Sequence, residues 1–599
     1  MKRLALFSCA LAVALIAVAC GGESATPTAA PTSPPTATTA PTATPVATAT
    51  PRPGQPTATA APPATRPAPT ATAAPATPTP GKQPKSGGQL TVGAITAITT
   101  VDFLSRSGSF GVFQTMGQAF NSLVRMDYET HATVAPALAE KWSVSATGDV
   151  WTFTLRQGVK WQDGRPFTAD DVAFSINRMV NPPEGFDVGF SGDVLSPLVR
   201  DAQKVDDTTV RINLKFPAAG FLESLAFPQN LIVPKHIWEP VYQAKGTLTE
   251  KHVIGTGPFR LKEHVPGISV ELSKNADYWA KDPSARQLPF IDSLKFFIIG
   301  DDQAGFAAFR TKQILQTRNA DRGIPAANLP IAEREQIRGY RLVRLPSYSH
   351  YSFDQVNVTK APFSDPRFRR ALHLALNRQE MGEFFDLGNK LAVLGGVMHP
   401  KAAWGIPLEE LEKLPGYRAD KTADREEAKR LLRAVGVPDG FEFTIVTSAG
   451  ASARVAETTL NSLQAISLKP KLQVVSILEL DTRQINKNFD VSFRARTEAI
   501  DDPNAFLVAT IRTGGTRNLG GYSNPEMDKL LDEQMRILDP AKRKAFAKDL
   551  QLKFLEESPY IRAFFFDYVY GFWNEVQGIN FGPSLWNGVG DYDRVWLDL

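Results

Sequence analysis

The chain has 599 residues, with 66 lysines and arginines, 62 aspartates and glutamates, and 43% hydrophobic residues. This length exceeds what one compact core can hold, so several domains are expected. A formal net charge of +4 over such a length excludes a nucleic-acid binder driven by electrostatics, which would carry a basic domain. Both cysteines, Cys9 and Cys20, lie near the start, which excludes disulfides and thiolate metal sites from the rest of the chain.

Residues 1–19 have the pattern of a secretory signal peptide. Lys2 and Arg3 precede an apolar run that is shorter than the ~20 residues of a membrane span. Small residues then precede Cys20, as in a bacterial lipobox, where the cysteine is lipidated and becomes the mature N-terminus. Ordinary signal-peptidase cleavage after Ala19 is the alternative and would release the protein. We expect an exported bacterial protein, lipid-anchored at Cys20 on the outer face of the cell membrane or in the periplasm.

Residues 20–85 are rich in proline, threonine and alanine after the lipidated cysteine. Residues 21–85 contain no aromatic residue and a single acid, Glu23. Such a segment cannot bury enough apolar surface to offset the entropy of ordering, so it is expected to be a disordered or polyproline-like stalk. A stalk of this kind holds a folded domain away from a membrane or wall.

The folded part is expected to begin near residue 86, and several segments show strand patterns. Apolar and polar residues alternate with the period of a half-buried strand, or apolar residues run together. The predicted strands are residues 89–93, 151–155, 210–214, 270–272, 294–299 and 441–446.

Helix starts are marked by capping residues before proline. Asp365, Asn524 and Asp539 each precede a proline and then apolar residues at helical spacing. Residues 168–171 resemble a capping box, and residues 420–435 form a helical pattern that Gly436 would close. Helices and strands alternate without a fixed repeat, which predicts an α/β or α+β protein of several sub-domains.

No sequence motif of catalysis is present. The histidines are scattered without metal-ligand spacing, and the glycine-rich residues 255–257 lack the lysine of a phosphate loop. The adjacent acids Asp501 and Asp502 could act as a general acid/base pair, or they could be a solvated loop or helix cap. We therefore expect no enzyme, no cofactor and no bound metal.

A series of short blocks closely resembles the family 5 extracellular solute-binding proteins, the peptide, nickel and dipeptide receptors of ABC importers. The resemblance extends over residues 86–599. The blocks follow the order of that family and lie at residues 136–142, 151–160, 163–172, 255–261, 275–279, 357–363, 365–372, 502–506 and 520–525.

The resemblance implies an α/β, two-lobed, periplasmic-binding-protein-like fold of type II with three sub-domains. Lobe 1 would be residues 86–350 and 561–599, with an inserted sub-domain at about 129–250, and lobe 2 would be residues 351–560. Two connecting strands would form a hinge, and the solute would be held in the cleft between the lobes.

The resemblance also points to the loop before Pro503 as a ligand site. Peptide-binding members carry an aspartate four residues before this proline, which pairs with the ammonium of the ligand. Here that position is Ala499, so Glu498 or Asp501 would have to replace it.

Two arginines, Arg494 and Arg496, precede this loop. A guanidinium suits a bidentate grip on a carboxylate, so the sequence predicts a solute with an acidic group. The alternative is that both arginines are solvated or pair with Glu498 and Asp501. The facing wall is expected from the loop after the first strand, with ligand contacts from Ser109, Phe110 and Phe113.

The predicted function is a substrate-binding lipoprotein that captures an oligopeptide or related small molecule and delivers it to the permease subunits of an ABC importer. Three alternatives remain at this stage: a non-peptide solute such as a metal chelate, an oligosaccharide or an amino-acid derivative; a secreted hydrolase; and a stalked surface protein. We expect a monomer that binds no nucleic acid.

Overall fold

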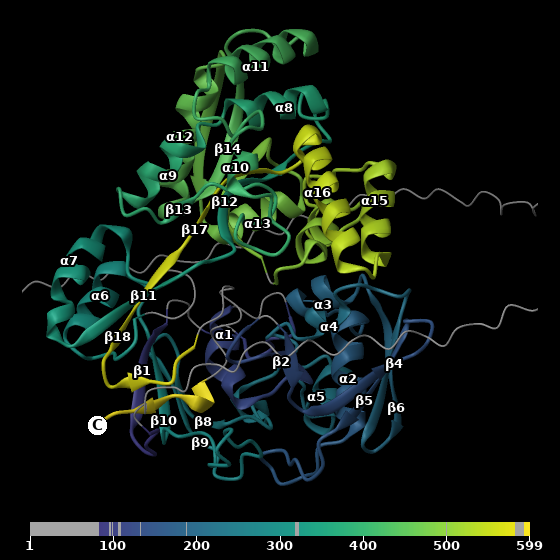
Figure 1. Cartoon of the computed structure of the whole chain (residues 1–599), viewed down its shortest axis with the longest axis vertical. Coiled ribbons are helices and arrows are strands. Elements are labelled where there is room, and N and C mark those ends of the chain that lie inside the picture. The colour runs from purple at the N-terminus through teal and green to yellow at the C-terminus, as the bar shows by residue number, and fades with distance from the viewer. Residues whose placement is uncertain are drawn as a thin grey trace, which may run out of the picture. The chain divides into compact units, whose positions relative to one another are not determined.

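A computed structural model describes residues 83–94, 98, 100–105, 110–131, 133–186, 189–317, 323–498, 500–580 and 592–599. All of them belong to one compact unit, residues 81–599, built from both helices and strands (Figure 1). The predicted signal peptide, Cys20 and nearly all of the stalk lie outside the described residues.

The first sheet contains the start of the folded part. Its strand order is β1-β10-β9-β8, and it confirms the strands predicted at 89–93, 270–272 and 294–299. Strand β1 runs parallel to β10 with Val92 opposite Phe296, and both side chains are fully buried. The strands are β1 (Gln89–Ala94), β8 (Phe259–Val265), β9 (Ser269–Lys274) and β10 (Ser293–Ile298).

A second sheet, in the order β4-β5-β7-β6, is packed against α2. Helix α2 begins at the predicted capping box, where the Thr168 backbone N–H donates to Asp171 Oδ2 at 3.0 Å. The elements here are β4 (Ala139–Val144), β5 (Val150–Leu155), β6 (Val199–Asp206), β7 (Thr209–Leu214), α2 (Ala169–Val180), α3 (Gly189–Leu195), α4 (Phe221–Leu225) and α5 (Lys235–Gln243). Three further elements lie between β1 and β4 in the sequence: α1 (Phe110–Thr115), β2 (Val124–Met126) and β3 (Val134–Pro136).

The third and largest sheet has the order β13-β17-β12-β16-β14-β15. Strand β14 is parallel to β15 and β16, whereas β12 is antiparallel to β16 and β17. The strands are β12 (Ser349–Val356), β13 (Ala392–Val393), β14 (Phe441–Ser448), β15 (Leu468–Val475), β16 (Val491–Thr497) and β17 (Ile561–Phe566).

The helices around this sheet begin where their caps predict. The carboxylates of Asp365 and Asp539 and the amide oxygen of Asn524 each accept a backbone N–H from the first turn of α8, α16 and α15. The helices are α8 (Pro366–Ala375), α9 (Arg378–Asp386), α10 (Leu408–Leu411), α11 (Thr422–Val435), α12 (Ala451–Gln464), α13 (Ile477–Ile485), α14 (Ala509–Ile511), α15 (Pro525–Arg536) and α16 (Pro540–Glu557). A π-helical turn at Asn504–Val508 precedes α14.

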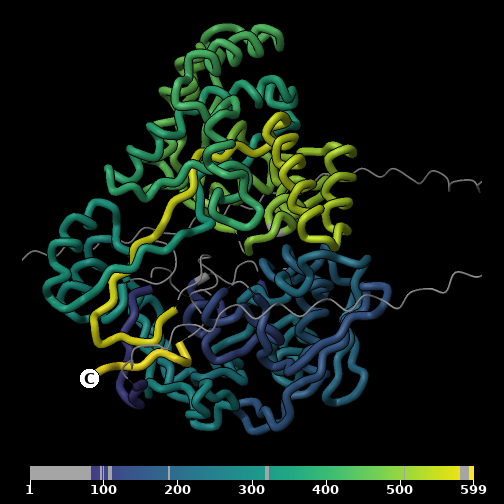
Figure 2. Tube along the Cα trace, in the orientation of Figure 1, coloured from purple at the N-terminus to yellow at the C-terminus, as the bar shows by residue number. Residues whose placement is uncertain are grey.

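The chain passes twice between the largest sheet and the rest of the molecule. Strand β11 (Tyr340–Leu345) continues into β12, and β17 continues through Asp567 into β18 (Tyr568–Trp573), while β11 and β18 pair with each other. Figures 1 and 2 show these two passages side by side. We call residues 349–566 the central segment, and residues 83–345 and 568–599 the flanking segments.

The remaining elements lie near these connecting strands and the end of the chain. Helix α6 (Asp302–Arg310) and helix α7 (Leu329–Glu335) share a core with β11 and β18. The short strands β19 (Val576–Gln577) and β20 (Trp596–Leu597) pair near the C-terminus. A continuous apolar core extends from β1 through β12 to Leu597.

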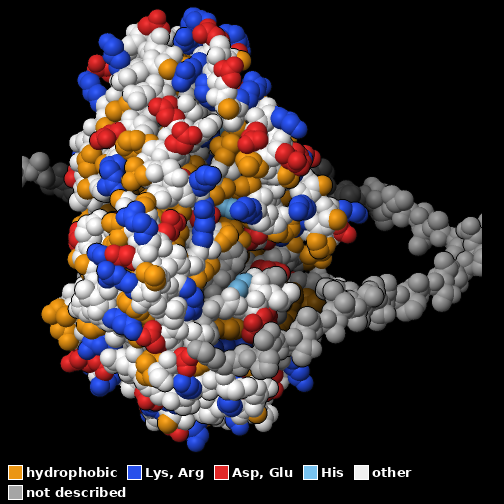
Figure 3. All heavy atoms as spheres, turned by 60° about the vertical axis from the view of Figure 1, so that its left-hand side comes forward, with side chains coloured by type: hydrophobic (Ala, Val, Ile, Leu, Met, Phe, Trp, Pro, Cys, Tyr) orange, Lys and Arg blue, Asp and Glu red, His pale blue; other side chains and the backbone are white. Residues whose placement is uncertain are grey.

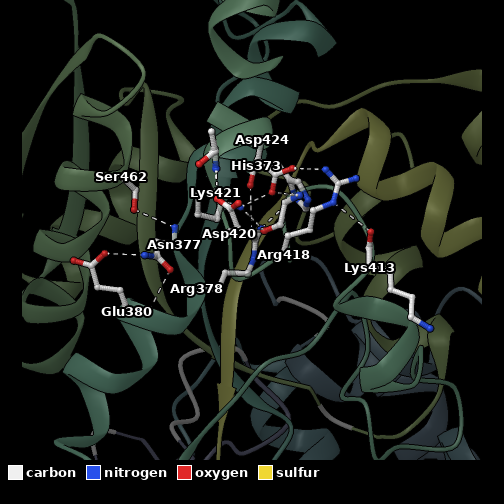
Figure 4. Close-up of polar contacts among 12 residues, drawn as sticks. His373, Asn377, Arg378, Glu380, Lys413, Arg418, Asp420, Lys421, Asp424 and Ser462 are labelled. Atoms are coloured by element: carbon white, nitrogen blue, oxygen red, sulfur yellow. Dashed lines mark hydrogen bonds and ion pairs between the residues drawn. The ribbon is translucent and has the colours of Figure 1, made fainter. Parts of the chain in front are cut away.

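A buried polar cluster ties α8, α9 and α11 together (Figure 4). The Asp424 carboxylate accepts the Lys421 ammonium at 2.7 Å and the Gly416 backbone N–H at 2.9 Å. Arg378 donates to the carbonyl oxygens of Gly416 and His373. Burial lowers the pKa of Lys421 to about 8, so Asp424 offsets the cost of keeping this ammonium in the interior.

Candidate functional site

Strand β12 carries one polar face and one aromatic face. His350, Ser352 and Asp354 alternate along the strand with Tyr351 and Phe353, and all five are buried. Because successive side chains of a strand point to opposite faces, the three polar groups share one side of the sheet. Pairing with β16 places Arg496 opposite His350 and Arg494 opposite Ser352, and Arg562 of β17 lies opposite Ser352 on the other side. We call this set the polar stripe: His350, Ser352, Asp354, Ser492, Arg494, Arg496 and Arg562.

Arg496 is oriented by a buried carboxylate. Its Nη2 and Nε donate to Asp354 Oδ2 at 2.8 and 3.1 Å. Asp354 also accepts Ser492 Oγ at 2.7 Å and Gln484 Nε2 at 3.0 Å. The Asp354 side chain is 0% exposed and that of Arg496 is 21% exposed, so the arginine extends from a fixed anchor toward solvent.

Arg494 has a different partner on a helix. Its Nη1 donates to Asp481 Oδ1 of α13 at 2.5 Å, and its side chain is 14% exposed. The two arginines therefore pair with Asp481 and Asp354, and not with Glu498 and Asp501 as one alternative held. Both guanidiniums remain partly exposed, and a role in solute binding stays a prediction.

Glu498 is part of a buried group of charges. Its Oε1 accepts Arg562 Nη2 at 2.8 Å and lies 3.7 Å from His350 Nε2. Burial, and then the charge of Arg562, hold the pKa of His350 well below its usual range, so this imidazole is neutral. Glu498 Oε2 is buried and accepts no hydrogen bond from the described residues. Arg562 thus donates to only one of the two carboxylate oxygens of Glu498.

Asp501 and Asp502 point in different directions. Asp501 Oδ2 accepts the Ala403 backbone N–H at 2.7 Å, whereas Asp502 accepts Arg543 Nη1 and Nη2 at 2.7 and 2.8 Å. Burial raises the pKa of Asp501 to about 6. Asp502 Oδ1 also accepts the Asn504 backbone N–H at 2.9 Å, just before the π-helical turn. The acid pair considered from the sequence therefore does not converge on a common point.

The predicted facing wall is only partly described. Ser109 lies outside the described residues, and Phe110 begins α1 but its side chain is not among those described. Phe113 is buried and lines a pocket of about 80 Å³ together with Asn121 and Trp279. All the residues that line this pocket belong to the flanking segments, so the structure does not place Phe113 beside the polar stripe within the described part of the chain.

Asp354, Asp481, His350 and Arg562 were not predicted as site residues. The signal for three of them is present in the sequence, because polar residues alternate with aromatic ones at 349–354 and Arg562 interrupts an apolar run. Such alternation indicates a strand with a polar face. That this polar face is buried becomes clear only once β12 is paired with β16 and β17 in the sheet.

Other site types find no support in the described residues. No group of three or more His, Cys, Asp or Glu side chains could hold a metal ion in the described part, and none of its helices is long and apolar enough to cross a membrane. Figure 3 shows basic and acidic side chains intermingled over one face, which is also hollowed at mid-height. This visible face lacks the single basic patch that a nucleic-acid binder presents.

Comparison with known proteins identifies close relatives. The pattern of the Bacterial extracellular solute-binding proteins, family 5 Middle, matches residues 133–518. The Glutathione-binding protein GsiB of Salmonella typhi is 28% identical over 439 residues, covering 72% of this chain and 80% of the relative. Di/tripeptide-binding protein 2 of Pseudomonas aeruginosa is 28% identical over 500 residues, covering 78% of this chain and 87% of the relative.

Solved structures show the same two-lobed fold. The ABC transporter-associated periplasmic binding protein DppA from Helicobacter pylori, in complex with peptide STSA, superposes with a TM-score of 0.72 at 23% sequence identity. The match covers 86% of this chain and 99% of that one. The described elements, from β1 to β20, therefore form the fold of the periplasmic peptide-binding proteins.

Proposed function

The chain belongs to the bacterial extracellular solute-binding proteins of family 5, and we propose that the solute is a short peptide or peptide-like molecule with an acidic group. The protein acts as the substrate-binding component of an ABC importer, and the similarly folded DppA is described as ABC transporter-associated. The relatives named for glutathione and for di- and tripeptides indicate the size and class of the molecule. Glutathione itself is a peptide with two carboxylates and one ammonium.

The observation that carries this proposal is the end of strand β16. Arg494 and Arg496 are fixed by Asp481 and Asp354 and still expose part of each guanidinium. The carboxyl ends of the parallel strands β14 and β16 meet at this edge of the sheet, which is where open α/β sheets bind ligands. A solute carboxylate would accept the remaining N–H groups of one or both arginines.

Glu498 and Asp501 would supply the negative side of the site. The free Oε2 of Glu498 and the carboxylate of Asp501 flank position 499, where relatives that bind peptides carry an aspartate. A solute ammonium near these groups would offset their burial. Its charge would also lower the pKa of Asp501 and favour the ionised form. Ser109, Phe110 and Phe113 remain the proposed contacts from the flanking segments.

We assign the lobes from strand pairing. The central segment, residues 349–566, would form one lobe, and the flanking segments would form the other. The residues at 346–348 and at Asp567, which connect the paired strands, would act as the hinge. These points lie within a few residues of the boundaries predicted from the sequence.

We also propose that the protein is a monomer anchored by a lipid at Cys20. The family is extracellular, and a leader with a cysteine after small residues precedes a long proline-rich stalk. Mass spectrometry of the membrane fraction would detect the diacylglyceryl modification of Cys20. A soluble mature protein beginning at Cys20 without lipid would contradict the anchor.

A thermal-shift screen tests the proposed solute. A ligand that binds the folded state must raise the melting temperature. We expect glutathione and short acidic peptides to raise it more than neutral peptides, oligosaccharides or nickel chelates do. If only a non-peptide compound raises it, the peptide assignment is wrong. Recovery of the bound compound unchanged by mass spectrometry would separate binding from hydrolysis.

An arginine substitution tests the site. Arg496→Ala should weaken binding of the identified solute by about 1–3 kcal/mol, because a charge-assisted hydrogen bond is lost. Arg430→Ala is the matched control, since Arg430 forms an exposed ion pair with Glu427 on α11. Equal affinities of the two variants would remove Arg496 from the site.

A further inference from the structure

The loop after β7, in the flanking segments, touches the central segment away from the connecting strands. The Ala219 backbone N–H donates to the Met535 carbonyl at 2.9 Å, and Asn504 Nδ2 donates to the Ala219 carbonyl at 3.4 Å. The Arg536 guanidinium lies 4.3 Å from the centre of the Phe216 ring. These contacts connect the β4-β5-β7-β6 sheet with α15 and the π-helical turn.

Gly220 lies at the centre of this contact. Its φ is +74°, and a Cβ at this position would lie 2.5 Å from Asp502 Oδ2 and 3.3 Å from Arg543 Nη1. The three atoms nearest to such a Cβ, two of Asp502 and one of Arg543, all belong to the central segment. A side chain at position 220 therefore clashes first with the central segment, and it is incompatible with the contact between the segments as it stands.

The surface that meets Gly220 is rigid. Arg543 holds Asp502 through two hydrogen bonds, and the side chains of both residues are almost completely buried. The Arg543 guanidinium also lies 4.6 Å from the centre of the Trp404 ring and donates to Gln534 Oε1. Because the carboxylate is fixed by this bidentate pair, it cannot move aside to admit a methyl group.

We propose that the contact of the Ala219–Gly220 backbone with Asp502, Asn504 and Met535 is a closing contact, which favours the closed state of the two lobes without touching the solute. This inference rests on the proposed function, in which the lobes close around the solute. Apparent affinity is proportional to the fraction of protein in the binding-competent state. Gly220 is therefore a residue that affects affinity without touching the solute.

The closing contact differs from the solute site in chemistry. Its direct links are backbone hydrogen bonds and the packing of a glycine on a buried ion pair. None of these groups belongs to the polar stripe. The closing contact should therefore bias closure equally for every solute, and so set affinity but not selectivity.

Two glycine substitutions test this inference. Gly220→Ala introduces the interlobe clash, and Gly158→Ala is its matched control, because Gly158 has φ +76° and no atom within 4 Å of its Cβ position. Both substitutions carry the same cost of a left-handed backbone, and both lie in the same part of the chain. Only Gly220→Ala should disturb the contact between the segments.

Solute-free closure is measured by the distance between spin labels on the two segments. The full chain would carry Cys9→Ser and Cys20→Ser, with labels at Lys141→Cys of β4 and Lys529→Cys of α15, which are exposed. We expect Gly220→Ala to shift the distance distribution to longer values and Gly158→Ala to leave it unchanged. Identical distributions for all three proteins would overturn the closing contact.

Affinity provides the second measurement, with glutathione as the probe. Gly220→Ala should weaken glutathione binding about ten-fold relative to Gly158→Ala, and the same ratio should hold for a second peptide that binds. Equal affinities would overturn the proposal. If glutathione does not bind the parent protein, glutathione is not the solute, and the spin-label distances alone decide whether the closing contact exists.

Discussion

Arg562 of β17 donates to Glu498, which follows β16, at 2.8 Å, and the two side chains are 2% and 3% exposed. Strand β12 lies between β17 and β16 in the sheet, so this ion pair joins segments on either side of β12. Because β17 also leads through Asp567 to the flanking segments, this ion pair links the proposed ligand loop to one of the two connecting strands. It gives the loop a fixed position relative to the proposed hinge.

Removal of one partner of this pair should be strongly destabilising. We expect Glu498→Gln to lower the free energy of unfolding by about 3–5 kcal/mol, because the Arg562 charge would remain buried without compensation. Urea unfolding at pH 7 measures the loss. The double variant Glu498→Met with Arg562→Met should recover at least half of this loss, because both charges of the pair are then removed together. A loss below about 1 kcal/mol in the single variant would show that water reaches the guanidinium.

The two arginines of β16 should differ in their contribution to stability. Arg496→Ala should cost about 2 kcal/mol, because it leaves Asp354, which is 0% exposed, with only neutral hydrogen-bond partners. Arg494→Ala should cost about 1 kcal/mol or less, because its partner Asp481 is 47% exposed and water can replace the arginine. Urea unfolding of both variants gives the comparison. The reverse order would mean that the Asp354 anchor does not require its arginine.

The raised pKa of Asp501 should make the free energy of unfolding depend on pH. Burial raises its pKa to about 6 in the folded state, from an ordinary value of 3.8. Between these values the folded state binds the proton and the unfolded state does not, so this carboxyl destabilises the fold progressively as pH rises from about 4 to 6. Asp501→Asn should therefore raise the free energy of unfolding by about 2–3 kcal/mol at pH 7.5 and by nothing below pH 4.

The control for this prediction is Asp439→Asn, at an exposed aspartate outside the site. It should not change the dependence of stability on pH. The gain from Asp501→Asn should be accompanied by weaker solute binding if Asp501 faces an ammonium. An increase in stability that persists at pH 4 would show that the gain does not come from ionisation.

Local signals in the sequence identified many of the elements correctly. Asp365 and Asn524 are caps with a proline after them, and both begin helices in the structure because the cap satisfies backbone N–H groups within a few residues. The alternation at 151–155 gives β5, with Phe153 and Leu155 buried. In each case the determining interactions lie within a short window of the chain.

The charge partners of the site could not be obtained in this way. Asp354 and Arg496 are separated by 142 positions, and Glu498 and Arg562 by 64. Which acid meets which arginine depends on the strand order β17-β12-β16, and no local pattern encodes this order. The sequence therefore pointed to the proposed ligand loop through family blocks, whereas the anchoring of the arginines that precede it required the assembled sheet.

The cluster around Asp424 allows us to predict how much stability is lost when its charge is removed, and how that loss depends on pH. Asp424→Asn should lower the free energy of unfolding by about 3 kcal/mol at pH 7, because Lys421 and Arg378 would lose the carboxylate that offsets their burial. Asp420→Asn is the matched control nearby, since Asp420 is exposed and accepts the Thr422 backbone N–H, which an asparagine oxygen can also accept, and it should cost about 0.5 kcal/mol or less.

The deficit of Asp424→Asn should also depend on pH in a defined direction. The folded pKa of Lys421 is lowered to about 8 from 10.5, so the folded protein releases this proton before the unfolded chain does, and stability rises with pH between these values. Above pH 8 the neutral amine no longer needs a counter-charge, and the difference between Asp424→Asn and the parent should therefore shrink. Urea unfolding at pH 6, 7 and 9 measures it. A deficit that is as large at pH 9 as at pH 6 would mean that the deficit does not come from the charge of Lys421.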